Sequence, residues 1–141
     1  MVFRDSSIRI RLDRLEEVIS ELLKLQLVGR EALERSRSMM WAVERGLHLG
    51  AEIVLDVGNH ILSDQYGVSP ADYGDIVRQL AQQGILDQGL KERLEGLAGF
   101  RNILVHDYIR LDPERVLEAL ARAPRDFGDF AHAIRAWLGS G

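Results

Sequence analysis

Apolar residues recur at intervals of seven through the second quarter of the chain, and this repeat constrains the fold more than any other feature. An interval close to seven keeps such residues on one face of a helix. The repeat predicts a helix over about 30–64, which would be about 50 Å long. That exceeds the needs of a small monomer, so we expect packing against its own chain and against a partner. The repeat consists of Leu33, Met40, Leu47, Val54 and Ile61, with Val43, Gly50 and Val57 between them.

Shorter helical patterns account for the rest of the chain. Asp87 and Asp112 are suited to cap helices that follow them, and Pro124 should divide the C-terminal part into two short helices. No segment alternates with a period of two for long enough to form a strand. Besides the long helix, the apolar spacing predicts helices over 8–28, 70–83 and 87–108, then two short ones between 112 and 138 that Pro124 separates.

These patterns predict an all-α bundle of about five to six helices built on a long antiparallel helical hairpin. A length of 141 residues without a linker suits a single domain over 1–141. The chain has no cysteine, which excludes disulfides and thiolate metal sites. It also lacks a long apolar run, so we expect a cytoplasmic protein without a membrane span.

The net charge of −4 argues against broad, phosphate-driven binding of nucleic acid. A local basic site remains compatible with it, because a cleft can focus a field against the overall sign. Glycine-rich nucleotide-binding loops and the G-x-S-x-G of serine hydrolases are both missing from the sequence. Any hydrolysis must therefore depend on acid–base groups and positive charge, and we expect no cofactor.

The segment 99–108 carries the most distinctive chemistry. Its sequence, Gly-Phe-Arg-Asn-Ile-Leu-Val-His-Asp-Tyr, continues a helical stripe of leucines. Arg101 falls within that stripe, although a guanidinium is costly to bury without a partner. Asn102 and His106 lie four residues apart on a neighbouring face, and Tyr108 ends the stripe. From the residues alone, a buried arginine satisfied by another helix and an ordinary surface histidine explain the segment as well as a catalytic site does.

The string from Arg101 to Tyr108 resembles the R-x4-6-H signature of HEPN domains, and in particular the R-N-x-L-V-H-x-Y of the HepT-like branch. The resemblance extends over about 5–138. It implies the HEPN-type fold and a ribonuclease toxin paired with a minimal nucleotidyltransferase antitoxin. It also implies that the transferase attaches adenylate groups to Tyr108, where a bulky anion beside Arg101 would exclude RNA by sterics and charge.

RNA is a substrate for which these few groups suffice, because its 2′-hydroxyl is an internal nucleophile beside the phosphorus. His106 is expected to move protons, since imidazole titrates near neutral pH. Arg101 is expected to stabilise the anionic phosphate, and Asn102 to orient the histidine or bind a phosphate oxygen. The predicted products, formed without added metal, are a 2′,3′-cyclic phosphate and a 5′-hydroxyl.

Arg101 and His106 are five residues apart, which separates them by about 140° on a regular helix. Either the helix loosens before Asp112, or two copies of the motif meet across a twofold axis. HEPN proteins typically use the second arrangement, so we predict a homodimer whose shared cleft takes Arg101, Asn102 and His106 from both chains.

Other interpretations remain open. Glu52, Asp56 and His60 share a helix face and are of metal-ligand type, but a solvated or inter-helix face is the more common meaning, and we predict no metal. Asn59 and His60 are also candidates to contact the motif. The alternative function is a non-catalytic binding module that partners a nucleotidyltransferase and presents nucleotide or substrate. A third hypothesis is a purely structural helical dimer, in which Arg101 is buried in the core and paired with another side chain.

Overall fold

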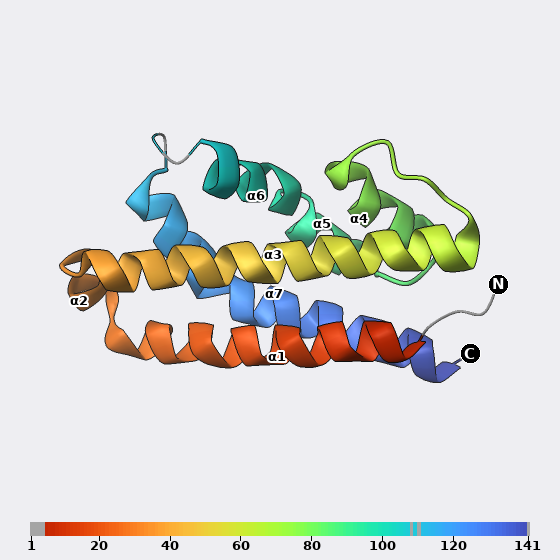
Figure 1. Cartoon of the computed structure of the whole chain (residues 1–141), viewed down its shortest axis with the longest axis horizontal. Helices are drawn as coiled ribbons and strands as arrows, with labels where there is room; N and C mark the ends of the chain where they lie inside the picture. The colour runs from red at the N-terminus through yellow and green to blue at the C-terminus, as the bar shows by residue number, and fades with distance from the viewer. Residues whose placement is uncertain (1–4, 108, 110, 141) are drawn as a thin grey trace.

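The fold is a helical bundle in which the long helix α3 separates two groups of helices. The computed structural model describes residues 5–107, 109 and 111–140. On one side of α3 (Arg37–Tyr66) lie α1 (Asp5–Val28), antiparallel to it, and α7 (Pro113–Ser140), as Figure 1 shows. On the other side lie α4 (Tyr73–Gln82), α5 (Gln88–Leu94) and α6 (Leu97–His106), and the short α2 (Arg30–Glu34) joins α1 to α3. The predicted all-α bundle on a long antiparallel hairpin is confirmed.

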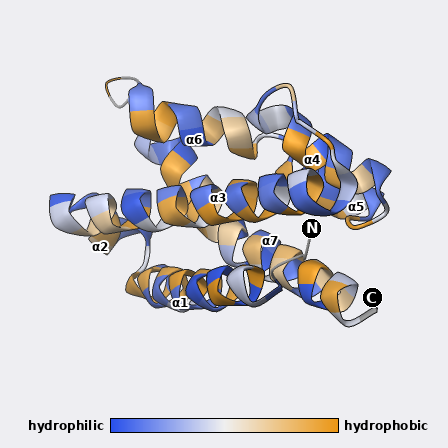
Figure 2. Ribbon diagram, turned by 45° about the vertical axis from the view of Figure 1, so that its right-hand side comes forward, coloured by the Kyte–Doolittle hydropathy of each residue, from blue (hydrophilic) through white to orange (hydrophobic). Residues whose placement is uncertain are grey.

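The seven-residue repeat forms the centre of the core. Leu33, Leu47, Val54 and Ile61 are buried and Met40 is partly buried, in one cluster with residues of the surrounding helices. Hydrophobic and hydrophilic residues alternate along the helices (Figure 2), as expected of amphipathic helices. The seven-residue repeat therefore packs within its own chain, as expected, and the packing of this helix against a partner chain stays a prediction.

Two glycines of α3 allow its neighbours to approach closely. A Cβ atom added at Gly50 would lie 2.7 Å from Cζ of Phe127 in α7. One added at Gly58 would lie 2.6 Å from Cγ2 of Ile76 in α4. Real Cβ atoms do not come so close, so these positions require the smallest side chain for helix packing.

The predicted helix over 30–64 is interrupted near its start. Ser36 adopts an extended backbone conformation, and its hydroxyl oxygen accepts a hydrogen bond from the Met39 backbone N–H at 3.2 Å. This N-cap begins α3, so that α2 is a separate short helix of five residues. At the other end, α3 continues to Tyr66 and stops at Gly67, whose φ of +64° is left-handed.

The middle helices also differ from the predicted ones. The predicted helix over 70–83 begins later, at Tyr73, where Asp72 caps α4 and accepts from the Asp75 backbone N–H at 2.8 Å. Asp87 caps the next helix as predicted, at 2.8 Å from the Leu90 backbone nitrogen. The expected helix over 87–108 is, however, divided between α5 and α6 at residues 95 and 96, so the motif helix is a short one of its own.

Pro124 does not end a helix, contrary to our prediction, because α7 continues through it. Proline has no N–H, so the carbonyl of Leu120, four residues earlier, lacks its usual donor. The side-chain amide of Gln26 in α1 donates to that carbonyl at 2.8 Å. A neighbouring helix thus replaces the hydrogen bond that the proline removes.

Among the described helices, none combines the length and the apolar character needed to cross a membrane. The regular secondary structure of the same residues consists of helices joined by loops, and they contain no strand.

Candidate active site

The motif residues lie on α6, which packs against α3 and α4. Leu97, Phe100 and Leu104 are partly buried against the core, and Ala98 is buried. This apolar face fixes the rotation of α6, and with it the direction in which the motif side chains leave the helix.

Arg101 is held by residues from three helices. Its side chain is only 14% exposed and its Nε donates to Glu52 of α3 in a close ion pair. Its Cζ lies 5.0 Å from the centroid of the Tyr73 ring, at the first residue of α4. Its Nη1 donates to Oδ1 of the adjacent Asn102 at 3.2 Å. A guanidinium bound by a carboxylate, a ring face and an amide has a fixed position and keeps further N–H donors for another anion.

The contacts of Arg101 continue along α3. Nε2 of His48 lies 3.5 Å from Oε1 of Glu52, one helical turn later. Nδ1 of His48 in turn accepts from Nη1 of Arg45 at 3.1 Å. Arg45, His48 and Glu52 therefore form a chain of polar contacts that ends at Arg101.

His106 is the last residue of α6 and is exposed, as is Asn102. The helix stays regular from Leu97 to His106 and ends at Asp107, whose backbone N–H donates to the Ile103 carbonyl at 3.1 Å. The backbone does not loosen between Arg101 and His106, so one chain leaves a mostly buried cation and an exposed imidazole on different faces of α6. Tyr108, the predicted modification site, lies outside the described residues.

The three polar residues weighed as metal ligands have separate partners. Glu52 binds Arg101, and Asp56 binds Nε of Arg11 at 2.6 Å. His60 lies with Nε2 3.0 Å from Asp64, but the geometry of that contact is not a hydrogen bond. The part of the chain that the structure describes contains no group of three metal-binding side chains. The contacts assign these residues to links between or within helices, and the sequence alone did not identify Glu52 as the partner of Arg101.

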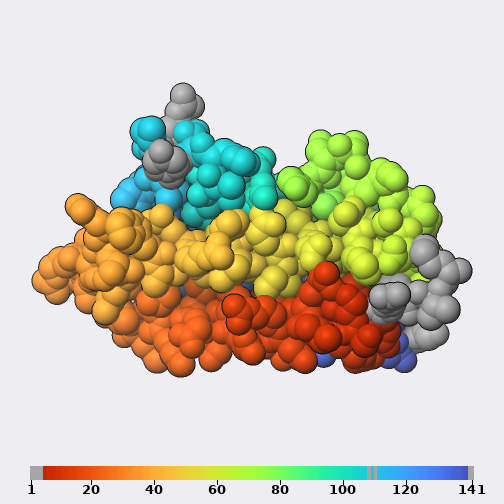
Figure 3. All heavy atoms as spheres, viewed as in Figure 1, coloured from red at the N-terminus to blue at the C-terminus, as the bar shows by residue number. Residues whose placement is uncertain are grey.

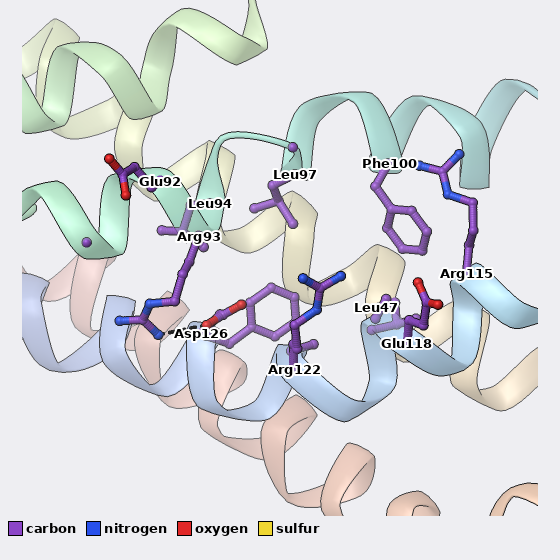
Figure 4. Close-up of a pocket in the computed structure, with 15 residues that line it drawn as sticks. Leu47, Glu92, Arg93, Leu94, Leu97, Phe100, Arg115, Glu118, Arg122 and Asp126 are labelled. Atoms are coloured by element: carbon purple, nitrogen blue, oxygen red, sulfur yellow. Dashed lines mark hydrogen bonds and ion pairs between the residues drawn. The ribbon is translucent and has the colours of Figure 1, made fainter.

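A cavity of about 500 Å³ opens on the other side of α6. Figure 4 shows Leu97 and Phe100 of α6 facing Arg115, Glu118 and Arg122 of α7 across it. Arg101, Asn102 and His106 are not among its lining residues. The cavity is therefore distinct from the cluster around Arg101.

Comparison with known proteins identifies the class. The model of the family described as ribonuclease HepT-like matches residues 12–134. This chain belongs to that family. It is 34% identical over 85 residues to the mRNA nuclease HepT of Shewanella oneidensis, an alignment that spans 60% of this chain and 64% of that protein. It is 26% identical over 132 residues to the tRNA nuclease HepT of Aphanizomenon flos-aquae, spanning 93% of this chain and 89% of that one.

Solved structures give the same assignment over nearly the whole chain. A tri-AMPylated HEPN toxin of Shewanella oneidensis in complex with an MNT antitoxin superimposes with a TM-score of 0.85 at 26% identity, covering 94% of this chain and 99% of that one. The cytosolic protein YutE of Bacillus subtilis superimposes with a TM-score of 0.81 at 27% identity, covering 99% of this chain and 94% of that one. The resemblance to HEPN proteins read from residues 101–108 is thus confirmed.

Proposed function

We propose that this chain is a metal-independent endoribonuclease toxin whose antitoxin is a nucleotidyltransferase. Membership of the HepT-like family supports the ribonuclease activity, and two relatives carry the names mRNA nuclease and tRNA nuclease. The single observation that carries the proposal is the fixed guanidinium of Arg101 on the same short helix as an exposed imidazole.

The proposed reaction uses the RNA itself as nucleophile. The 2′-oxygen attacks the adjacent phosphorus, the bond to the 5′-oxygen of the next nucleotide breaks, and a 2′,3′-cyclic phosphate and a 5′-hydroxyl result. His106 takes the proton of the 2′-hydroxyl or supplies one to the leaving oxygen. Arg101 stabilises the extra negative charge on phosphorus with the N–H donors that Glu52 and Asn102 leave available. Asn102 holds the guanidinium and binds a phosphate oxygen.

The cleft of this enzyme is proposed to be shared by two chains. A regular α6 directs Arg101 and His106 about 140° apart, so one chain alone does not bring both to one phosphate. A twofold axis beside α6 would supply Arg101 from one protomer and His106 from its partner. The exposed side of α6 is the proposed dimer surface, because it carries Asn102 and His106, the residues that the partner's site needs.

Inhibition is proposed to follow from modification of Tyr108. The phenol oxygen attacks the α-phosphorus of ATP on the transferase, pyrophosphate leaves, and the adenylate remains on the tyrosine. A solved neighbour is described as a tri-AMPylated toxin in complex with an MNT antitoxin, which supports this mode here. An adenylate two residues beyond His106 would add negative charge where the RNA phosphate has to bind.

We propose one domain over 1–141 and a cytoplasmic location. The family match over 12–134 supports one domain over 1–141. The cytosolic description of the similar YutE supports a cytoplasmic location.

The alternative function is a binding module that presents nucleotide or substrate to the transferase without cutting RNA. The net charge of −4 favours it. Purified protein incubated with transfer RNA and with a transcribed messenger RNA in excess chelator separates the two. The toxin proposal predicts cleavage, and prior treatment with the transferase and ATP should stop it. Intact RNA after incubation with the untreated protein would instead support the binding module.

A further inference from the structure

A row of side chains on the first half of α3 leads toward Arg101. Arg37, Trp41 and Arg45 follow one another at four-residue intervals, and His48 and Glu52 continue the row. At 100° per residue all five fall within an arc of about 80°. Figure 3 shows this part of α3 at the surface beside α6. We call Arg37, Trp41 and Arg45 the α3 stripe.

Trp41 leaves 62% of its surface exposed, which is unusual for so large an apolar side chain. The two arginines flank it, one turn before and one turn after. An exposed indole offers a flat face on which a nucleobase of any sequence can stack, and neighbouring guanidinium groups can hold the phosphates on either side.

The arginines of the stripe are free to bind an outside anion. Most described arginines make an ion pair with a carboxylate, for example Arg93 with Asp126 at 2.7 Å and Arg135 with Asp13 at 2.9 Å. Arg45 donates to the ring of His48, and among the described residues neither Arg45 nor Arg37 makes an ion pair with a carboxylate. An unpaired guanidinium on an acidic protein carries a local positive charge that suits a phosphate.

The stripe is connected to the motif by contacts already described. Arg45 donates to His48 at 3.1 Å, His48 lies 3.5 Å from Glu52, and Glu52 binds Arg101. Along the helix axis, Trp41 and Glu52 are about 16 Å apart. A single strand of a few nucleotides can therefore reach from the indole to the guanidinium of Arg101.

We propose that the α3 stripe binds the single-stranded RNA that flanks the cleaved phosphate, with a base stacked on Trp41 and phosphates on Arg37 and Arg45. This inference rests on the proposed ribonuclease function, since it assigns the strand a path from Arg101 along α3. It gives RNA a local binding surface on a protein whose overall charge repels nucleic acid.

The test measures binding of a short fluorescein-labelled single-stranded RNA by fluorescence anisotropy, in the full-length protein carrying His106→Ala so that the probe is not cut. Trp41→Ala should weaken binding about 5- to 100-fold, and Trp41→Phe should restore most of it. Arg37→Ala with Arg45→Ala should lower the slope of log affinity against log salt by about 1.4. Two control variants on α1 should leave binding unchanged. Ile10→Ala removes a side chain that is 69% exposed, and Arg14→Ala removes an arginine that is paired with Glu17 at 2.8 Å.

Unchanged RNA affinity in Trp41→Ala and in the double arginine variant would overturn the inference. So would a loss of dimer or of transferase binding in these variants with RNA affinity retained, since the stripe would then be a protein interface. Cleavage assays in the chain with His106 intact keep the two proposals apart. If that chain cuts RNA while the stripe variants bind normally, only the inference fails. If it never cuts RNA while the stripe variants lose binding, only the ribonuclease proposal fails.

Discussion

Arg101 of α6 is ion-paired with Glu52 of α3, a residue 49 positions earlier in the chain. The arginine side chain is 14% exposed and the glutamate side chain 40%. The carboxylate thus lies at the edge of the site and the guanidinium inside it. This arrangement explains how a cation is tolerated in a stripe of leucines, and it fixes the direction of the guanidinium before any substrate binds.

Replacing Glu52 should affect activity more than stability. Glu52→Gln keeps the size of the side chain but loses the charge that orients Arg101, so kcat should fall about 10- to 100-fold. Because the pair is partly exposed, the free energy of unfolding should change by no more than about 1 kcal/mol. RNA cleavage kinetics and thermal melts measure the two effects.

Asp56→Asn provides the matched control for that experiment. Asp56 lies one turn further along α3 and pairs with Arg11 at 2.6 Å, away from the motif. Its replacement should leave kcat unchanged. An equal loss of kcat in both variants would mean that Glu52 does not act through Arg101.

Gly50 tests the close packing of α3 on α7. Gly50→Ala would bring a methyl group to 2.7 Å from Cζ of the fully buried Phe127, so it should destabilise the protein by about 1–3 kcal/mol. Gly128→Ala, in α7, meets nothing within 4 Å and should be neutral or stabilise by about 1 kcal/mol. Denaturant unfolding of both variants checks this, and equal stability would disprove the close approach.

The contact between the starts of α2 and α7 should make stability depend on pH at the acid end. Hydrogen bonding to Arg30 holds the pKa of Glu114 below its ordinary value of 4.5. A carboxyl group with a lowered pKa stabilises the folded state above its unfolded pKa, and this contribution is lost as the pH falls through the lowered pKa. Glu114→Gln should therefore melt at a lower temperature than the unchanged protein at pH 7, and the difference should shrink well below pH 4.5.

Arg30→Gln should reproduce that pH dependence, because it removes the same pair from the other side. The double variant should then lose little more than either single variant. A melting difference that stays constant from neutral to acid pH would show that Glu114 acts in another way, for instance through its place in the first turn of α7.

Much of the fold followed from local rules, whereas the error at Pro124 and the packing of the long helix involve contacts between helices, which the spacing of residues does not reveal. Asp87 caps its helix as predicted, and the seven-residue repeat is helical and buried. The predicted helix break at Pro124 was wrong, because Gln26, on another helix, replaces the hydrogen bond that the proline removes. The repeat indicated a buried helix face, but not which helices of the chain cover it.

The candidate site was predictable in its residues and less so in its surroundings. An arginine among leucines implied a partner on another helix, yet nothing in the sequence selected Glu52 over the acids near it. The position of the Tyr73 ring over Arg101 depends on how α4 packs against α6, which the sequence does not reveal. Trp41 gave no signal, because an aromatic residue in a helix is usually assigned to the core.

Modification by the transferase should depend on Tyr108. Tyr108→Phe lacks the phenol oxygen that accepts adenylate, so mass spectrometry after incubation with the transferase and ATP should find no added nucleotide. The variant should keep its ribonuclease activity and resist inhibition. Tyr73→Phe is the control, because it retains the ring over Arg101 and should still be modified and inhibited. Adenylate on the Tyr108→Phe chain would contradict this assignment.

The most direct test of the shared cleft is RNA cleavage in chelator by Arg101→Ala and His106→Ala chains, first separately and then after unfolding and refolding them together. Each variant alone should remain helical and lose at least about 100-fold in rate. The mixture should regain activity, because a mixed dimer joins Arg101 of one protomer to His106 of its partner. Wild-type rates in either single variant, or a refolded mixture as inactive as its components, would contradict the account.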